Sequence, residues 1–198
     1  MNRRSIVIAA LFMITFSVSN ADEVKNDSIP VGTGIGQIPE VDEVTRLGED
    51  SLMAEYMPLD KGNVWTYSVQ KGDKTKEHTQ SVISESGGWS VFDNYFGKEA
   101  VSLRIAPGGE LLVTNEGVVS PFYNNEVMMS FPKKAVETPG GKFEQAMVVT
   151  MPEDREFWFR DVYVKGVGLV FHEQKTPTGS SSYSLLKAKV GGKDYPPQ

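Results

Sequence analysis

The sequence contains no cysteine among its 198 residues. Thiol nucleophiles, thiolate zinc sites, disulfides and redox roles are therefore excluded. Histidine is almost as scarce, because His78 and His172 are the only two, and a zinc site needs three or four ligands. We expect both histidines to be ordinary exposed or half-buried strand residues, and we predict no metal site and no cofactor.

An excess of basic residues is also missing. The chain has 20 Lys and Arg against 26 Asp and Glu. Without residues 1–21, which hold Arg3 and Arg4, 18 basic residues face the same 26 acidic ones, and the net charge is −8. Neutralising phosphates requires clustered Lys and Arg, and so does adhesion to anionic lipid headgroups. Nucleic acid is therefore excluded as a partner.

The apolar stretch from Ile6 to Val18 is shorter than the roughly 20 residues that a membrane-spanning helix needs. It follows the two arginines and precedes Ser19-Asn20-Ala21, whose small residues are typical of a cleavage site. The pattern predicts a signal peptide over residues 1–21 and no membrane anchor after its removal. We therefore expect an exported protein in the periplasm, with release outside the cell as the alternative.

Residues 22–54 contain no aromatic residue and are rich in Asp, Glu, Gly and Pro. Such a composition predicts a flexible linker, although residues 41–54 have loosely helical spacing. Gly32, Gly34 and Gly36 lack the strand and the helix that flank a phosphate-binding loop. The rest divides into a domain over residues 55–190 and a tail over residues 191–198.

Short runs of alternating apolar residues, separated by turn residues, fill the predicted domain. Residues 63–70 and 75–84 flank a Lys-Gly-Asp turn and predict a hairpin. Roughly nine to eleven such strands follow one another about every ten residues. This spacing predicts an all-β fold, with a single antiparallel meander forming a curved sheet, a half-barrel or a barrel.

Some strands carry apolar side chains on both faces. In residues 155–164, Phe157, Phe159 and Tyr163 alternate with Trp158, Val162 and Val164. Strands of this kind occur inside layered structures or in sheets that wrap around something. The pattern therefore leaves open a ligand cavity inside the fold.

Catalytic signals are weak, and we assign no catalytic residue. Residues 152–161 gather four carboxylates near an aromatic ring, as a glycosidase would require. We favour a charged turn with solvated ends, because Arg155 and Arg160 supply neutralising partners. Trp158 and Trp89 could instead stack on a sugar in a carbohydrate-binding module. The four carboxylates are Glu153, Asp154, Glu156 and Asp161, and the candidate ligand contacts are Trp158, Tyr163 and Trp89.

Three stretches in order resemble a family of exported bacterial β-domains of unknown function that includes TapB-like proteins. They are "YMPLDKGNVWTY", "GKF" and "GVGLV", which match a Y-x-P-L-x-x-G-x-x-W-x-Y opening, a G-x-F strand and a late hairpin. The resemblance covers residues 56–190 and implies fold and compartment, without catalytic residues. Family members often carry a lipid-attachment cysteine after the signal, which this chain lacks.

The residue types in this shared pattern suggest structural roles in turns and in the core. We expect glycines at turns, Gly62 and Gly166 with φ > 0 and Gly168 at a close backbone approach or a bulge, and aromatic residues that anchor strands. The signature residues are Pro58, Gly62, Trp65, Tyr67, Gly141, Phe143, Gly166 and Gly168.

The function expected from the sequence is that of an exported, non-enzymatic domain that binds a hydrophobic small molecule or an envelope protein. The alternatives are a hydrolase that uses the carboxylates of residues 152–161 and a carbohydrate-binding module.

Overall fold

The computed structural model describes residues 41–46, 53–99, 101–115, 117–123, 126–151 and 156–197. The predicted signal peptide and most of the predicted linker lie outside these ranges. The described elements are β1 (Val41–Arg46), α1 (Met53–Tyr56), β2 (Val64–Lys71), β3 (Lys74–Ser86), β4 (Trp89–Asp93), β5 (Val101–Ile105), β6 (Leu111–Asn115), β7 (Val118–Pro121), β8 (Met128–Pro132), β9 (Val136–Thr138), β10 (Gly141–Phe143), β11 (Ala146–Thr150), β12 (Trp158–Val164), β13 (Gly168–Thr176), β14 (Gly179–Val190) and β15 (Lys193–Tyr195).

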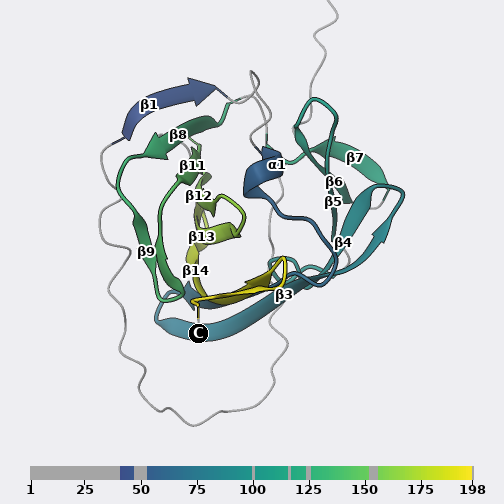
Figure 1. Ribbon diagram of the computed structural model, residues 1–198. Coiled ribbons are helices and arrows are strands. Elements are labelled where there is room, and N and C mark those ends of the chain that lie inside the picture. The colour runs from purple at the N-terminus through teal and green to yellow at the C-terminus, as the bar shows by residue number, and fades with distance from the viewer. Residues whose placement is uncertain are drawn as a thin grey trace, which may run out of the picture.

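Almost all of these strands belong to one antiparallel sheet, in the order β1-β8-β11-β12-β13-β14-β2-β3-β4-β5-β6-β7, with β15 added to β14. Strands β9 and β10 form a separate hairpin. The sheet bends into an open trough in which α1 lies between the two sides (Figure 1). Its ends, β1 and β7, are not paired with each other among the described residues. The predicted all-β curved sheet is confirmed, in its open form.

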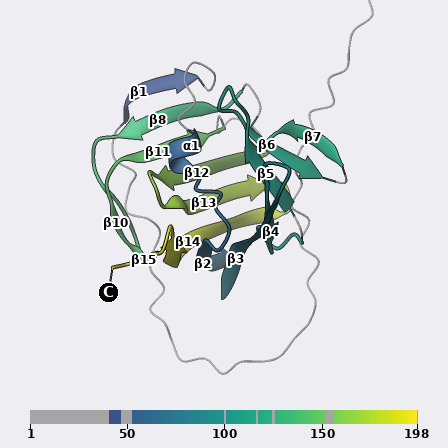
Figure 2. The ribbon, with the colours of Figure 1, turned by 45° about the vertical axis from the view of Figure 1, so that its right-hand side comes forward.

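The strands on one wall of the trough, from β8 through β11 to β14, run side by side and lead into β2 and β3 (Figure 2). The other wall consists of β4, β5, β6 and β7. Most neighbours along the sheet are consecutive hairpins, whereas β14 pairs with β2 over a large sequence distance. This pairing brings the first long strand of the domain beside the last one.

Residues 41–46 correct one expectation from the sequence. They form strand β1 and pair with β8, with Val44 opposite Ser130 and Thr45 opposite Met129. The helix suggested by the loose spacing over residues 41–54 is therefore wrong for residues 41–46, and the described helix α1 begins at Met53. Backbone pairing along the edge of β8 gives β1 hydrogen bonds that a helix interrupted by Gly48 would hold poorly.

Trp65 and Tyr67 of β2 form hydrogen bonds to the hairpin of β12 and β13, which lies farther along the same sheet. Trp65 Nε1–H donates to the carbonyl of Val167 at 2.7 Å, and the Tyr67 hydroxyl donates to that of Leu169 at 2.9 Å. Both aromatic side chains are at most 1% exposed. Both residues are therefore part of the buried core.

The glycines of the β12–β13 turn have the conformations that the sequence predicts. Gly166 has φ = +70° and Gly168 has φ = +99°. A Cβ atom at Gly168 would lie 3.2 Å from Trp65 Nε1 and 3.4 Å from Pro58 Cδ. Gly168 is thus the site of a close approach, where the opening stretch of the signature meets its late hairpin.

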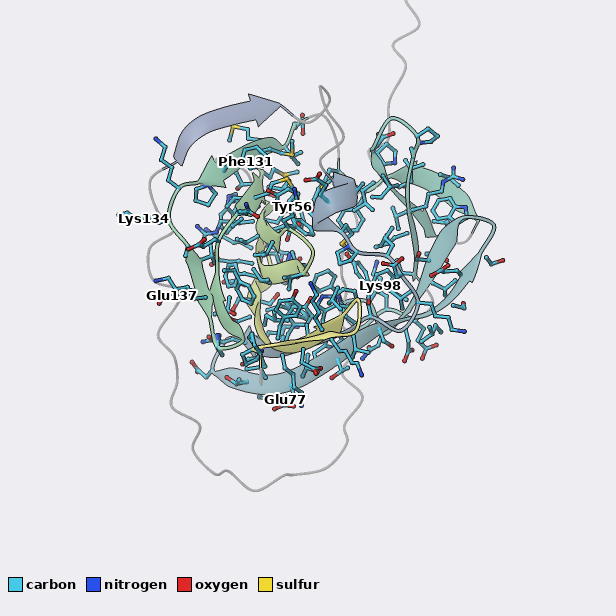
Figure 3. The ribbon with its side chains drawn as sticks, viewed as in Figure 1. Tyr56, Glu77, Lys98, Phe131, Lys134 and Glu137 are labelled. Atoms are coloured by element: carbon cyan, nitrogen blue, oxygen red, sulfur yellow. The ribbon has the colours of Figure 1, made fainter. Side chains whose placement is uncertain are left out.

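Helix α1 joins the same turn from inside the trough. The carbonyl of Glu55 accepts a hydrogen bond from the Gly166 amide at 2.9 Å, and its carboxylate pairs with Lys165 at 2.7 Å. Tyr56 faces Phe131 of β8 with a ring distance of 6.4 Å, and Figure 3 labels both residues near the upper part of the trough. Side chains from α1 and from the sheet thus pack together inside the curve.

Candidate functional site

Asp161 and His172 form a buried pair on one wall of the trough. They lie opposite each other on β12 and β13, and Asp161 Oδ1 is 2.5 Å from His172 Nδ1. Their exposed fractions are 4% and 7%. The expectations that Asp161 is solvated at a strand end and that His172 is exposed or half-buried are wrong, because both side chains point to the inner face of the sheet.

Two tyrosines extend this pair into a hydrogen-bonded chain. The Tyr123 hydroxyl donates to Asp161 Oδ2 at 2.5 Å and lies 2.5 Å from the Tyr163 hydroxyl. Because the Tyr123 hydroxyl donates its hydrogen bond to Asp161, it accepts one from the Tyr163 hydroxyl. We call these four residues the Asp161–His172 cluster. Its carboxylate accepts two charge-assisted hydrogen bonds, one on each oxygen.

Burial keeps the tyrosines of the cluster protonated. Desolvation, followed by the negative charge of Asp161, raises the pKa of Tyr123 and of Tyr163 well above the ordinary value of 10.0. Both hydroxyls are consequently hydrogen-bond donors throughout the physiological pH range. The chain Tyr163–Tyr123–Asp161 therefore has a fixed donor direction, which ends at the carboxylate.

One nitrogen of the cluster has no partner. His172 Nε2 is buried and makes no hydrogen bond with any described residue. An ionised Asp161 only accepts hydrogen bonds, so the proton of the pair resides on His172 Nδ1 and fixes the orientation of the ring. The same two features, an oriented imidazole and a free Nε2, occur where histidine binds a ligand or a reacting group.

Aromatic rings pack against the imidazole ring of His172. The ring of Phe96 lies 4.8 Å from the His172 ring, and the ring of Tyr183 lies 5.7 Å from it. Tyr95 packs edge-on against Phe96 at 4.8 Å, and its hydroxyl is also buried without a partner. The arrangement is an apolar enclosure that contains two unsatisfied polar atoms.

Tyr95 and Phe96 lie in a tight loop that connects β4 to β5. Asn94 and Phe96 both have left-handed backbone conformations, with φ values of +57° and +49°. Asparagine adopts this region readily, whereas a bulky residue is an outlier there and costs about 1–2 kcal/mol. The loop is held by the Asn94 Nδ2 bond to the Thr79 carbonyl at 2.9 Å, and by the Phe96 amide bond to Gln80 Oε1 at 3.3 Å.

His78 is the second histidine that the structure places in the interior. It is 8% exposed, its Nε2 has no partner, and burial lowers its pKa. Its ring contacts Tyr183 at 5.6 Å, so Tyr183 touches both histidines. Within the described ranges, no group of three or more His, Asp and Glu side chains is arranged to hold a metal ion.

Of the three ligand contacts predicted from the sequence, only Tyr163 lies in the cluster. Trp158 and Trp89 are half-buried, and an arginine lies over each ring, Arg160 at 5.5 Å and Arg104 at 4.5 Å. These guanidinium groups occupy a ring face that a sugar would need for stacking.

The two described carboxylates near Trp158, Glu156 and Asp161, do not share a location. Asp161 is buried in the cluster, and Glu156 is exposed. Glu153 and Asp154 lie outside the described residues. Arg160, which the sequence suggested as a neutralising partner, pairs with Glu173 of β13 at 2.6 Å.

No family model and no curated protein matches the chain. Two solved structures are similar to it. One is a protein from Bacteroides fragilis that is proposed to be exported and has a YmcC-like fold, with a TM-score of 0.39 and 15% identity over 68% of this chain and 98% of that chain. The other is a proposed lipoprotein from Parabacteroides distasonis, with a TM-score of 0.38 and 14% identity over 67% and 97%. At these scores the likeness is too distant to assign a family or an activity.

Membrane-spanning helices are absent from the described part of the chain, since none of its helices is both long and apolar enough.

Proposed function

We propose that the chain is an exported, non-enzymatic binding domain whose ligand site is the interior of the trough beside His172. Export is supported by the sequence of residues 1–21, where Arg3 and Arg4 precede a short apolar stretch and a small-residue cleavage pattern. The periplasm is the proposed compartment, because no lipid-attachment cysteine follows the signal.

The observation that carries the proposal is the unpartnered Nε2 of His172. Buried polar atoms in folded proteins nearly always have a hydrogen-bond partner, and an exception calls for a water, an ion or a ligand. Here the ring is held in place by Asp161, so its free nitrogen has a defined direction. A site in which one nitrogen is fixed and the other is free is prepared for a partner from outside the chain.

Binding is favoured over catalysis because the cluster has no nucleophile. In hydrolases built on an Asp–His pair, a serine or thiol group hydrogen-bonds to Nε2. No side chain within the described ranges occupies that position at His172, and the Tyr123 hydroxyl is engaged by Asp161 and Tyr163. We therefore infer that the cluster binds a molecule and does not react with it.

The surroundings of His172 favour a small molecule that is mostly apolar. Phe96 and Tyr183 contact the imidazole ring, and Tyr95 and Tyr163 complete the enclosure with side chains that are 4% and 1% exposed. An apolar body gains free energy from contact with such rings, at about 25 cal/mol for each Å² removed from water.

The test is to identify what the protein carries after export. The full chain is purified from the periplasmic fraction of its bacterial host, extracted with organic solvent, and the extract is analysed by mass spectrometry. We expect an apolar small molecule that is enriched over the extract of an unrelated exported protein, reduced in His172→Gln and retained in the matched control His78→Gln. An extract of the parent chain without any enriched molecule would contradict the proposal.

A second candidate function is docking of another envelope protein at the free edge of the sheet. Strand β7 ends the sheet, and its Val118 and Val119 are 68% and 52% exposed. The backbone of an edge strand can pair with an extended segment of a partner. We expect cross-linking within intact cells to join the parent chain to an envelope protein. This cross-link should be lost in the double variant Val118→Lys with Val119→Lys and retained in the control Ile83→Lys. The parent chain and that envelope protein, once purified, should bind each other again. Equal cross-linking of all variants would exclude this edge.

A further inference from the structure

The ring of Phe96 packs against the imidazole ring of His172 and is tilted by 45° from it. Its ring lies 4.8 Å from the imidazole ring, and its side chain is 6% exposed. The backbone that carries it has φ = +49°, a conformation that a phenylalanine adopts only when its surroundings impose it. A movement of the loop that takes the Phe96 backbone out of this conformation would therefore release strain, at the cost of the 3.3 Å bond from the Phe96 amide to Gln80 Oε1.

The hydrogen-bond requirement of His172 defines the group that would replace the ring. The His172 tautomer that has its proton on Nδ1, directed at Asp161, presents a lone pair at Nε2. A lone pair in a buried position is satisfied by a donor. A hydroxyl group supplies one donor on a small, uncharged atom.

The charge balance inside the trough favours a neutral molecule. Burial, and then the negative charge of Asp161, raise the pKa of Tyr95, Tyr123 and Tyr163, so the field of this carboxylate reaches all three side chains. A carboxylate or a phosphate buried there would be repelled by Asp161, in addition to the cost of removing its own charge from water.

We propose that the site takes a neutral, ring-shaped alcohol of the phenol class, which takes the place of the Phe96 ring and donates its hydroxyl proton to Nε2 of His172. This inference rests on the proposed function, since it names the ligand chemistry of the same site. The loop of residues 94–97 moves to admit the molecule, and Asp161 keeps the imidazole oriented during the exchange.

The first experiment compares three probes of similar size on the full chain by isothermal titration calorimetry: phenol, benzene and benzoate. Benzene leaves water more readily than phenol, so in a wholly apolar site it binds more tightly. We expect phenol to bind about fivefold more tightly than benzene, the ratio that one hydrogen bond of ordinary net strength supplies. We expect no measurable binding of benzoate.

Two variants test the place of binding. Phe96→Ala removes the ring that packs against His172, and we expect it to raise the affinity for phenol by roughly tenfold, because exposing a displaced ring to water no longer opposes binding. Phe143→Ala is the matched control, since it removes an equally buried ring from the β9–β10 hairpin. Phenol binding should be unchanged in that variant.

The outcomes separate this inference from the proposed function. Benzene binding as tightly as phenol would overturn the hydroxyl partner, and tight binding of benzoate would overturn the neutral ligand, while a ligand site remains in both cases. No binding of phenol to the parent chain would overturn the inference, and an extract from the periplasmic protein without an enriched molecule would overturn the proposed function as well. Equal gains in Phe96→Ala and Phe143→Ala would show that phenol fills any new hole.

Discussion

Among single residues, Tyr123 contributes the hydroxyl that links Asp161 to Tyr163, at 2.5 Å from each. We expect Tyr123→Phe to lower the free energy of unfolding by about 2–3 kcal/mol, because a buried carboxylate loses one of its two donors. Urea unfolding followed by tryptophan fluorescence measures the change. Tyr67→Phe is the control, because it removes a neutral bond to the Leu169 carbonyl and should cost about 1 kcal/mol. Equal losses would contradict a special role for the carboxylate.

Gly168 and Gly166 offer a matched pair of glycines in one turn. Both have positive φ, but a Cβ atom meets Trp65 and Pro58 only at Gly168, whereas the space around Gly166 is open. We expect Gly166→Ala to lower the free energy of unfolding by about 1 kcal/mol, from backbone strain alone. Gly168→Ala should cost about 2–3 kcal/mol, because overpacking adds to that strain. The same urea titration decides, and a smaller loss at Gly168 would count against the close approach.

His78 makes the stability of the protein depend on pH. Burial lowers its pKa below the ordinary value of 6.5, so the unfolded chain binds a proton at this residue more readily than the folded chain. This contribution to stability is present above pH 6.5 and is lost as the pH falls toward the folded-state pKa. We therefore expect the loss of stability between pH 7.5 and pH 5 to be smaller in His78→Gln than in the parent chain. Thermal unfolding at each pH measures this difference. If the parent chain and His78→Gln lose the same stability over this pH range, the prediction is refuted.

At the scale of elements, Gly140 fixes the β9–β10 hairpin to β14. Its amide donates to the Leu185 carbonyl at 2.7 Å, and a Cβ atom there would lie 2.9 Å from that oxygen. We expect Gly140→Ala to displace the hairpin, to lower the free energy of unfolding by roughly 1–3 kcal/mol and to speed hydrogen exchange in β9 and β10. Gly108→Ala, where the added atom meets nothing, should be neutral or slightly stabilising. Unaltered exchange in Gly140→Ala would show that the hairpin does not depend on this contact.

Most individual hairpins could be predicted from the sequence because their signals are local. The Lys-Gly-Asp turn between β2 and β3 is present, with Gly72 at φ = +58°. Strand β12 has both faces buried from residue 161 to residue 164, as the apolar residues on both sides indicated. These features depend on neighbours within a few residues, which period-two patterns and turn residues describe well.

The Asp161–His172 pair could not be predicted because it depends on a one-residue irregularity. Val164 lies opposite Gly168, and a regular hairpin would then place Asp161 opposite Phe171. A shift between Val162 and Tyr163 moves the register by one residue, so that Asp161 faces His172 instead. A shift of one residue exchanges the two faces of a strand, and no turn signal in the sequence indicates it.

At the scale of the whole molecule, the trough brings together residues that are far apart in the chain. Tyr123 follows β7 at one end of the sheet, whereas Asp161 and His172 lie on strands of the opposite wall. The sequence predicted a curved sheet but not which walls face each other, because curvature arises from the accumulated twist and from bulges. The long-range pairing of β14 with β2 is likewise invisible to local patterns.

The central claim is that the interior beside His172 is a ligand site, and the most direct measurement is the ¹⁵N NMR spectrum of the imidazole nitrogens during a phenol titration of the full chain. The account predicts that Nε2 of His172 shifts toward the value of a hydrogen-bonded acceptor. Nδ1 of His172, which Asp161 already holds, and both nitrogens of His78 should change little. If the His172 resonances stay in place at saturating phenol, or if only His78 responds, the account is contradicted.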